Sequence, residues 1–355
     1  MFVSVIIPTY NRKDYVRESI DSALAQRGIA VEVIVVDDGS QDGTGEALLD
    51  YGDQIRYVWQ ENQGESSARN HGVRIARHEY VALLDSDDLW QPDSLAKRVS
   101  LLENDPALGA VFSKAWLVDE EGKRLDAPPL SDHVKSDDLT LESLCLKNNL
   151  VASTAVFRRS IFDKVGGFDS EIQFGEDWDL WLRFALESKL GFVDEPLVYV
   201  RRHTGAQQHF PNARRAEQEI GDRVKMLEKI FSLAQERFDD DYQNRCLAHH
   251  YGLAAFQQYA VGRGEKGREL LAYAAELDSN EWRSEERLRE EMVSVALRKI
   301  AAEGGRSAEP GVQCVKEAVA YWPSEIPTSR DWGRKTIAKV YALSLIHISE
   351  PTRPY

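Results

Sequence analysis

Cysteine is scarce in this chain of 355 residues. Its three cysteines, Cys145, Cys246 and Cys314, stand far apart, with no CxxC pair and no cysteine and histidine spacing typical of zinc ligands. We therefore expect neither a disulfide framework nor a structural zinc site. Three isolated thiols fit a reducing compartment, which predicts a cytoplasmic protein.

Long apolar runs and targeting signals are also missing. No stretch approaches the ~18 consecutive apolar residues that a membrane-spanning helix needs. Met1 leads within two residues into a strand-like apolar run, with no basic segment or cleavage site before it. We expect no transmembrane segment, and peripheral contact with the inner face of a membrane stays open.

Positive charge is in short supply. The chain has 44 Lys and Arg against 59 Asp and Glu, a net charge of −15 and a pI near 5.1. Nucleic-acid affinity depends mainly on clustered Lys and Arg, so a nucleic-acid partner is not expected. An anionic ligand would need a local cation to offset repulsion.

Glycine-rich phosphate loops do not occur where they would be expected. Neither GxxxxGK[ST] nor GxGxxG follows the first apolar run, which ends in Pro8-Thr9-Tyr10. That ending also argues against two rival classes. A phospho-receiver domain places an acidic pair there, and a sugar nucleotidyltransferase usually begins with a glycine-rich loop containing Arg or Lys.

Four apolar runs alternate with helical patterns in the first 120 residues. The runs span residues 3–7, 33–36, 55–59 and 80–84. They are apolar throughout rather than alternating, which is typical of strands covered on both faces. Their alternation with helices predicts a Rossmann-like α/β domain with a mostly parallel sheet.

Polar residues follow each run, at the edge where open α/β sheets bind ligands. They are Thr9 and Tyr10, Asp37 and Asp38, Asn62 and Gln63, and Asp85 to Asp88. Adjacent carboxylates repel each other unless a cation or a donor lies between them. Oxygen ligands suit Mg²⁺ or Mn²⁺, which would also bridge the phosphates of an anionic donor. The alternative is that loops are polar and that aspartates such as Asp88 only cap the next helix.

Four segments in order resemble the family 2 glycosyltransferases, over roughly residues 2–210. They are VSVIIPTYNR (3–12), VIVVDDGSQDGT (33–44), ARNHG with LLDSDDLWQPD (within 62–93), and GGFD with GEDWDLWLR (within 166–183). The resemblance implies a GT-A fold and an inverting transferase. Such an enzyme moves a sugar, such as a hexosyl group, from a nucleotide diphosphate to an acceptor hydroxyl.

The resemblance also implies donor-site residues. Pro8, Thr9, Tyr10 and Asp38 match the segments that hold the nucleotide base, and UDP is the base carrier that the family uses most often. Asp85 and Asp87 match the DxD motif. Asp85 would lie near the donor ribose and be the second candidate metal ligand. Asp87 would bind the Mg²⁺ or Mn²⁺ that bridges the diphosphate.

Asp177 matches the family's catalytic base, with Glu176 as its acidic neighbour. A base is required because an acceptor hydroxyl is a poor nucleophile until its proton is removed. The alternative is structural, since acidic residues at a helix N-terminus interact favourably with the helix dipole. Trp178 and Trp181 fit either an acceptor platform or a helix core.

Residues 196–203 resemble the family's closing loop, in which Arg201 would meet phosphate and His203 would approach the metal. The tyrosine that usually precedes this arginine is Val200 here, with Tyr199 displaced by one, so Arg202 is the alternative to Arg201. His203 could equally be a solvated surface residue.

These observations predict a GT-A catalytic domain over 1–212, followed by an all-α region over 213–342. Residues 251–278 resemble one tetratricopeptide-like helix-turn-helix, and a helical appendage is the alternative. Residues 343–355, which contain LSLIHISEPTR, resemble translated adapter sequence and are expected to be non-native.

The predicted function is metal-dependent sugar transfer onto a glycan, a polysaccharide, a glycolipid or a protein-linked glycan. The alternative is a non-catalytic GT-A module that holds a nucleotide or a glycan. Nothing in the sequence predicts an oligomeric state.

Overall fold

The computed structural model divides the chain into two compact units, Met1–His203 and Thr204–Tyr355. The residues that it describes are 2–203, 213–278, 282, 285–302, 307–320, 323, 332–333 and 335–340. The expected non-native tail, 343–355, lies outside them. The first unit is α/β and the second is helical, as the sequence predicts.

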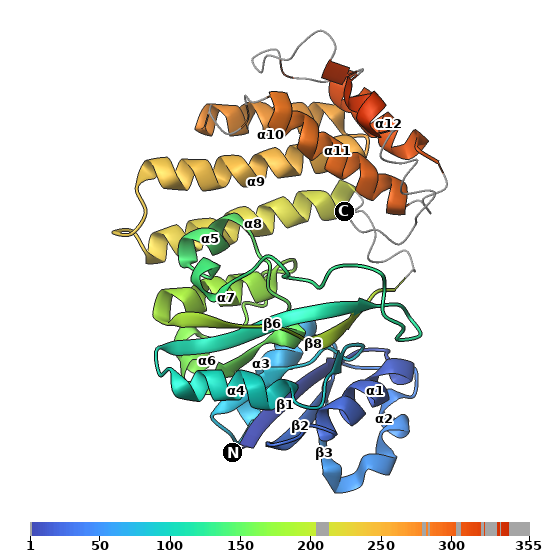
Figure 1. Cartoon of the computed structure of the whole chain (residues 1–355), viewed down its shortest axis with the longest axis vertical. Coiled ribbons are helices and arrows are strands. Elements are labelled where there is room, and N and C mark those ends of the chain that lie inside the picture. The colour runs from blue at the N-terminus through green and yellow to red at the C-terminus, as the bar shows by residue number, and fades with distance from the viewer. Residues whose placement is uncertain are drawn as a thin grey trace. The chain divides into compact units, whose positions relative to one another are not determined.

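The described residues of the first unit form a mixed sheet of eight strands (Figure 1). The strand order is β3-β2-β1-β4-β7-β6-β8-β5. Neighbours β3, β2, β1 and β4 are parallel, as are β6 and β8, and the other pairings are antiparallel. The strands are β1 (Phe2–Thr9), β2 (Ala30–Asp37), β3 (Ile55–Trp59), β4 (Tyr80–Leu83), β5 (Leu89–Trp90), β6 (Leu108–Val118), β7 (Val156–Arg158) and β8 (Lys189–Arg201).

Helices connect and cover these strands. The α-helices are α1 (Lys13–Leu24), α2 (Thr44–Ala47), α3 (Glu65–Ile75), α4 (Ser94–Asn104), α5 (Leu141–Leu146), α6 (Arg159–Val165) and α7 (Glu176–Glu187). Short 3₁₀ turns are η1 (Leu49–Gln54), η2 (Ser136–Asp138) and η3 (Ala152–Thr154).

Strand β1 shows why its run is apolar throughout. Successive side chains of a strand point to opposite faces. Val5 and Ile7 belong to the core cluster that includes residues of α1 and α4. Ile6 faces α3 so closely that a Cβ at Gly72 would lie 2.4 Å from its Cγ2. Both faces of β1 are therefore buried under helices.

Two local expectations differ from the structure. The helix expected near residues 46–51 is instead α2 and η1, which meet at Leu48, and the backbone leaves helical geometry within η1 at Gly52, where φ is +48°. The segment that resembles a closing loop is mostly strand, since β8 continues through Arg201 and pairs with β6. Only Arg202 and His203 extend beyond it within the described residues.

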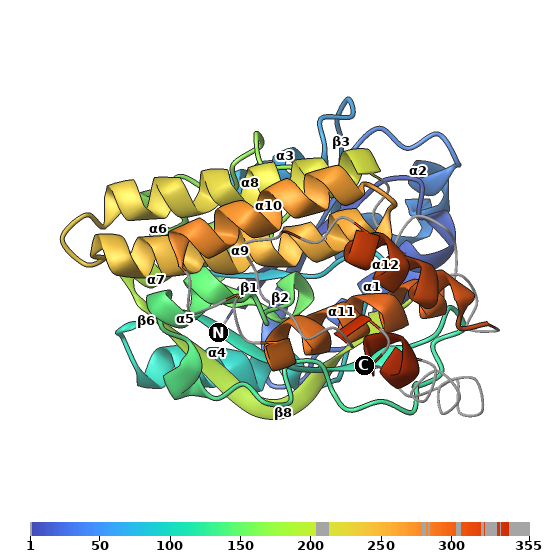
Figure 2. The same cartoon turned by 90° about the horizontal axis from the view of Figure 1, so that it is seen from above.

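The second unit contains α8 (Ala213–Leu233), α9 (Asp240–Ala260), α10 (Gly264–Leu277), α11 (Glu285–Ala302) and α12 (Glu309–Ala320). Both α8 and α10 run beside α9 (Figure 2). Gly252 of α9 lies against the Trp282 ring, where an added Cβ would come within 2.0 Å. Residues 251–277 do form a helix-turn-helix, and its tetratricopeptide character stays a prediction. Within the described ranges, no helix combines the length and apolar composition needed to cross a bilayer.

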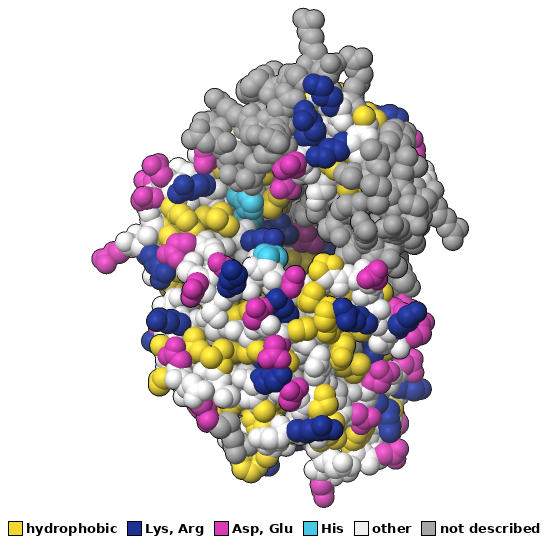
Figure 3. Space-filling model, in the orientation of Figure 1, with side chains coloured by type: hydrophobic (Ala, Val, Ile, Leu, Met, Phe, Trp, Pro, Cys, Tyr) yellow, Lys and Arg dark blue, Asp and Glu magenta, His cyan; other side chains and the backbone are white. Residues whose placement is uncertain are grey.

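Charged side chains of both signs are mixed on one face of the first unit. On the face shown in Figure 3, Lys and Arg are interspersed with Asp and Glu over its described residues. The acidic excess of the sequence is therefore dispersed on this face.

Candidate active site

The carboxyl ends of β1, β2 and β4 lie next to one another, because these strands are parallel neighbours. Thr9 pairs in register with Asp37, and the Asp38 N–H donates to the Thr9 carbonyl at 2.9 Å. The acidic segment, Asp85 to Asp88, follows directly after β4. The sequence thus predicts correctly that these polar residues converge on one edge of the sheet.

Asp38 is buried and organises the loop between β3 and α3. Its carboxylate accepts hydrogen bonds from Gln60 Nε2 at 2.7 Å, the Gln63 N–H at 3.0 Å and the Gly64 N–H at 2.8 Å. Asp38 therefore shapes the wall of the site through the Gln60 side chain and two backbone N–H groups. Its expected contact with a nucleotide base stays a prediction.

Pro8, Thr9 and Tyr10, at the carboxyl end of β1, differ in how far they are exposed. Pro8 is buried in β1 opposite Val36, and Tyr10 is half exposed. The Thr9 hydroxyl is buried and has no hydrogen-bond partner within the described part of the chain. A buried polar group without a partner is unfavourable, so Thr9 is suited to receive one from a ligand.

Arg69 of α3 connects the acidic segment to the start of α7. Its guanidinium donates to Glu65 at 2.5 Å and Asp85 at 2.8 Å through Nη2, and to Glu176 at 2.9 Å through Nη1. Burial would lower the pKa of this guanidinium, but the three carboxylates raise it well above its usual value. A permanent positive charge therefore lies between two carboxylates that are 91 positions apart in sequence, Asp85 and Glu176.

Asp87 and His203 form the second contact of the acidic segment. His203 Nε2 lies 2.7 Å from Asp87 Oδ2, and Arg12 approaches the same oxygen at 3.9 Å. Both side chains of the 2.7 Å pair are mostly buried. A carboxylate and an imidazole at this distance are suitable protein ligands for a divalent cation.

The described residues contain no group of three or more His, Cys, Asp or Glu side chains arranged to hold a metal. Mg²⁺ commonly takes only one or two carboxylates from the protein and completes its shell with substrate phosphates and water. The pair of Asp87 and His203 fits that mode of binding. Asp85 is turned toward Arg69 instead.

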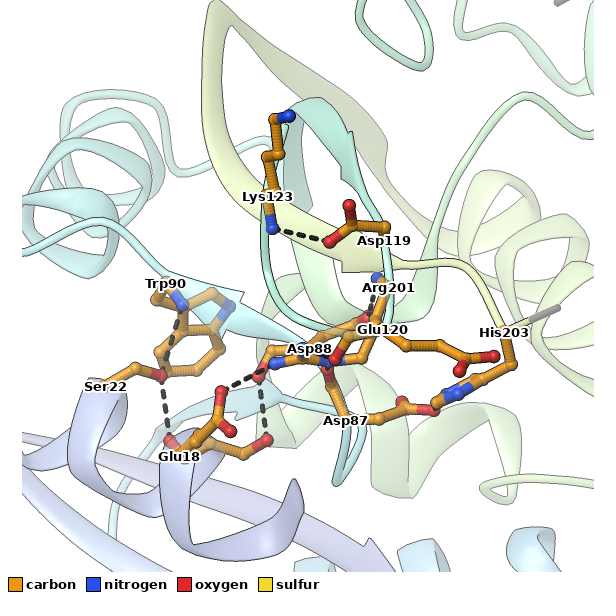
Figure 4. A network of polar contacts seen from close by, with 11 residues as sticks. Glu18, Ser22, Asp87, Asp88, Trp90, Asp119, Glu120, Lys123, Arg201 and His203 are labelled. Carbon is orange, nitrogen blue, oxygen red and sulfur yellow. Dashed lines mark hydrogen bonds and ion pairs between the residues drawn. The ribbon is translucent and has the colours of Figure 1, made fainter. Parts of the chain in front are cut away.

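Arg201, at the end of β8, holds the backbone of the acidic segment (Figure 4). Its N–H donates to Asp88 Oδ1 at 3.0 Å, and its Nε donates to the Asp87 carbonyl at 2.9 Å. The guanidinium also reaches Glu18 of α1 at 2.7 Å and the Glu120 carbonyl at 2.5 Å. Arg201 is thus a buried structural clamp, whereas Arg202 is exposed. A phosphate contact of Arg201 stays a prediction.

Asp88 lies beneath the segment and does not cap α4. It is 3% exposed and accepts from Ser153 Oγ at 2.6 Å, while the Asp85 N–H donates to the same hydroxyl oxygen at 3.0 Å. Burial, and then the charges of Asp85 and Asp87, raise the pKa of Asp88 well above its usual value. The capping interpretation was wrong because the N-cap of α4 is Asp93, five residues later.

Asp177 and Glu176 form the first turn of α7, which begins after Gly175 at φ +83°. The Trp178 N–H donates to Asp177 Oδ1 at 2.7 Å. Burial, and then the charge of Glu176, raise the pKa of Asp177 to about 7, against an opposing effect of Arg69. A carboxyl group with a pKa near the working pH is suited to general base catalysis.

Sequence comparison decides the family. The sequence profile of glycosyl transferase family 2 matches residues 4–166. An uncharacterized glycosyltransferase of Nostoc sp. is 31% identical over 226 residues, covering 60% of this chain and 68% of that protein. This chain belongs to glycosyl transferase family 2.

Another relative of this family 2 member is matched over a smaller share of its length. An uncharacterized glycosyltransferase of Rickettsia typhi is 36% identical over 203 residues, and the match covers 57% of this chain and 64% of that protein. The chain thus spans less than two thirds of that relative. Among solved structures, S. aureus TarS 1-349 in complex with UDP-GlcNAc has a TM-score of 0.62 at 19% identity, covering 91% of this chain and 93% of that one. That likeness confirms the fold.

Sequence reasoning about this family 2 member missed Arg69, Ser153 and Glu18. Arg69 is the arginine of the ARNHG motif. A positive charge in a motif that lies between two acidic segments could have predicted that it pairs with them. Ser153 gave no signal, because it meets the acidic segment only in the folded chain. Glu18 gave none, because its partner is Arg201, 183 positions away.

The structure supports the core explanation for the two tryptophans of α7. Trp181 is fully buried and packs edge-on against Phe112, with ring centroids 4.8 Å apart. Trp178 is 8% exposed and donates from Nε1 to the Leu144 carbonyl at 2.7 Å. Neither ring offers a face broad enough for a sugar, so the acceptor-platform interpretation is wrong.

Proposed function

We propose that this chain is an inverting, metal-dependent glycosyltransferase. It transfers a sugar from a nucleotide diphosphate, with a UDP-sugar as the favoured donor, to a hydroxyl of a glycan, polysaccharide or glycolipid. The observation that carries the proposal is the Arg69 bridge from Asp85 to Glu176. It holds the acidic segment and the start of α7 as two halves of one site.

The donor half contains the strand ends. In the proposal, Pro8, Thr9, Tyr10 and Asp38 surround the base and Asp85 meets the ribose. The unpartnered hydroxyl of Thr9 supports this role, since it needs a hydrogen-bond partner. The complex of TarS with UDP-GlcNAc, a protein of the same fold, supports UDP as the carrier.

Asp87 and His203 would hold Mg²⁺ or Mn²⁺. When bound, such a cation supplies positive charge for the negative charge that develops on the departing diphosphate. Arg201 keeps Asp87 in place by binding its carbonyl, and Arg69 keeps Asp85 in place. These contacts orient the protein ligands before the donor arrives.

The acceptor half is Asp177. Its ionised carboxylate would take the proton of the acceptor hydroxyl while that oxygen attacks the anomeric carbon. Attack from the face opposite the leaving diphosphate inverts the anomeric configuration. Glu176 raises the proton affinity of Asp177 and is held by Arg69.

The direct test is Asp177→Asn, assayed as release of nucleoside diphosphate from UDP-sugars with Mn²⁺. Turnover should fall at least ~100-fold, because the acceptor proton loses its base. Affinity for UDP should be unchanged, because Asp177 lies outside the donor half.

Glu187→Gln, at the far end of the same helix, is the matched control and should leave turnover within about twofold, as expected for surface substitutions. Near-normal turnover in Asp177→Asn would remove Asp177 from the mechanism. A wild-type protein that binds UDP but releases none from any sugar donor would instead be a non-catalytic GT-A module.

We also propose a cytoplasmic location, at the inner face of the membrane where lipid-linked acceptors are used. The three buried cysteines, none of which forms a disulfide in the described residues, are compatible with a reducing compartment. Fractionation of cells that express the tagged chain would test this.

A further inference from the structure

A cavity of about 610 Å³ opens on the first unit beside the carboxyl end of β2. Its wall comes from the segment after β2, from α2 and η1, and from the edge strand β3. The residues that matter here are Asp37, Gly45, Glu46, Leu49, Tyr57 and Trp59. The mechanism proposed above uses none of them.

Exposed apolar side chains gather at this cavity. In the described part of the first unit, the large hydrophobic residues that are exposed are Phe2, Tyr10, Leu49, Tyr57 and Trp59. The last three line the cavity, with Trp59 at 55% and Leu49 at 75% exposure. Apolar surface concentrated in one concave place marks a binding site more often than apolar residues scattered singly.

The aromatic wall is held in place by the surrounding residues. Tyr57 and Trp59 are two positions apart on β3, so they share one face of the strand. Tyr57 Oη donates to Asp37 Oδ2 at 2.7 Å, which fixes the tyrosine ring. A Cβ at Gly45 would lie 2.7 Å from that hydroxyl, so the ring can occupy this place only because Gly45 has no side chain.

The chemistry of the lining selects against anions. Asp37 and Glu46 contribute carboxylates, and none of the described lining residues is Lys or Arg. A phosphate or an acidic sugar would meet uncompensated negative charge. Aromatic faces beside hydrogen-bond acceptors instead match a neutral sugar chain, which has apolar C–H faces and hydroxyl edges. The volume lies within the roughly 300–1,000 Å³ of small-ligand sites.

The cavity adjoins the donor site without sharing its groups. Asp37 and Asp38 are consecutive, but the Asp37 carboxylate binds Tyr57 and the Ser40 N–H. The Asp38 carboxylate binds the loop between β3 and α3. A ligand in the cavity would therefore leave the donor half free.

We propose that this cavity binds a neutral glycan chain, with Trp59 as the stacking surface. The role of the chain as an anchored acceptor rests on the proposed function. The binding itself does not, which allows the two to be tested separately.

The test titrates the full chain with cellotetraose, chitotetraose and maltotetraose by ligand-observed NMR and calorimetry. At least one should bind with a Kd of about 1 mM or tighter, a binding free energy of about −4 kcal/mol. Trp59→Ala should weaken that binding at least tenfold, and Trp59→Phe should stay within about threefold, because it keeps an aromatic face.

Phe2→Ala is the matched control, since Phe2 is equally exposed but stacks on His78 away from the cavity. It should leave glycan affinity unchanged, and UDP affinity should be unchanged in all three variants. Circular dichroism checks that each variant is folded.

The proposal would be overturned if no tetrasaccharide binds, or if Trp59→Ala binds the tetrasaccharide as tightly as the wild type does. It would also be overturned if Trp59→Ala changes the sedimentation of the protein but not its glycan affinity, which would make the aromatic wall an interface between copies of the chain. Donor turnover without tetrasaccharide binding would overturn this inference and leave the proposed function intact. Tetrasaccharide binding through Trp59 without donor turnover would support this inference and overturn the proposed function.

Discussion

The carboxyl group of Asp177 lies where burial and the neighbouring Glu176 both oppose its ionisation, and its pKa is about 7. A general base works only when ionised. We therefore expect kcat to rise about tenfold per pH unit below pH 7 and to level off above it. A profile of nucleoside diphosphate release from pH 5 to 9 is the measurement, and a rate that is flat between pH 5 and 7 would contradict it.

The raised pKa of Asp177 also affects the stability of the fold, and this effect gives an independent check on the pKa. Folded Asp177 keeps a proton that the unfolded chain has released between about pH 4 and pH 7. The contribution of Asp177 to stability is therefore lost as pH rises through that window. Asp177→Asn should match the wild-type Tm at pH 4 and exceed it by several degrees at pH 8, because only the wild type loses this contribution as the pH rises.

Arg69 provides the second test at this scale, because three carboxylates depend on its charge. Arg69→Met should destabilise the first unit by about 2–3 kcal/mol, less than a fully buried ion pair because Glu65 is half exposed. That corresponds to about 5–10 °C in Tm.

Arg69→Lys should recover only part of this loss, since one ammonium cannot donate to all three carboxylates in the geometry of a guanidinium. Arg74→Met removes an exposed cation from the same helix and serves as the control. Equal Tm values for the Arg69→Met and Arg74→Met variants would show that the bridge contributes nothing.

Among the elements, η3 matters more for the site than its three residues suggest. Ser153 accepts from the Asp85 N–H and donates to Asp88, so it fixes both ends of the acidic segment. Buried Arg98 of α4 holds the turn itself, donating to the Thr154 carbonyl at 2.6 Å. We expect Ser153→Ala to weaken UDP affinity about tenfold by loosening this segment, at a cost in stability of about 1–3 kcal/mol.

Thr154→Val is the matched control for Ser153, because the Thr154 hydroxyl donates only to the Val151 carbonyl of the same turn. It should cost stability while leaving UDP affinity unchanged. Should both variants weaken UDP affinity equally, Ser153 would have no positioning role beyond that of the turn.

The sequence predicted the elements whose signal is local. The first four strands are each followed by polar residues that the parallel pairing brings together. The expectation that all four are covered on both faces was wrong for β3, an edge strand on which Arg56, Tyr57 and Trp59 are exposed. By contrast, β6, β7 and β8 were not predicted. The pairings among them join residues 45 to 83 positions apart, such as Ala110 with Phe157 and Leu108 with Lys189. No short window of sequence contains that information.

The site shows the same division. Asp87 and His203 were expected near a common ligand from motifs, and the structure places them 2.7 Å apart. The hydrogen-bonding partners of Arg201 could not be foreseen, because they come from α1, the acidic segment and the stretch after β6. The sequence shows which side chains of the site are charged, but which of them pair with one another depends on how distant elements pack.

For the molecule as a whole, the two units have separate hydrophobic cores. One core cluster contains residues from Val3 to Val198, and the other contains residues from Ile220 to Val340. Because a ligand stabilises only what binds it, UDP with Mn²⁺ should raise the unfolding temperature of the first unit alone. At 100 times Kd the gain is about 2.7 kcal/mol, or about 5–10 °C.

Differential scanning calorimetry of the full chain, with and without UDP and Mn²⁺, is the measurement. Two unfolding transitions should be visible, and UDP with Mn²⁺ should shift only that of the first unit to higher temperature. A single transition that moves as a whole would show that the units unfold together.

His203, which pairs with Asp87, is also the last residue of the first unit. A truncation placed after Val200 would keep nearly all of the sheet and yet delete both the clamp on the acidic segment and the imidazole. A junction for a chimeric enzyme therefore belongs after His203. A protein shortened on the wrong side of that junction should fold and yet lack the imidazole that we propose as a metal ligand.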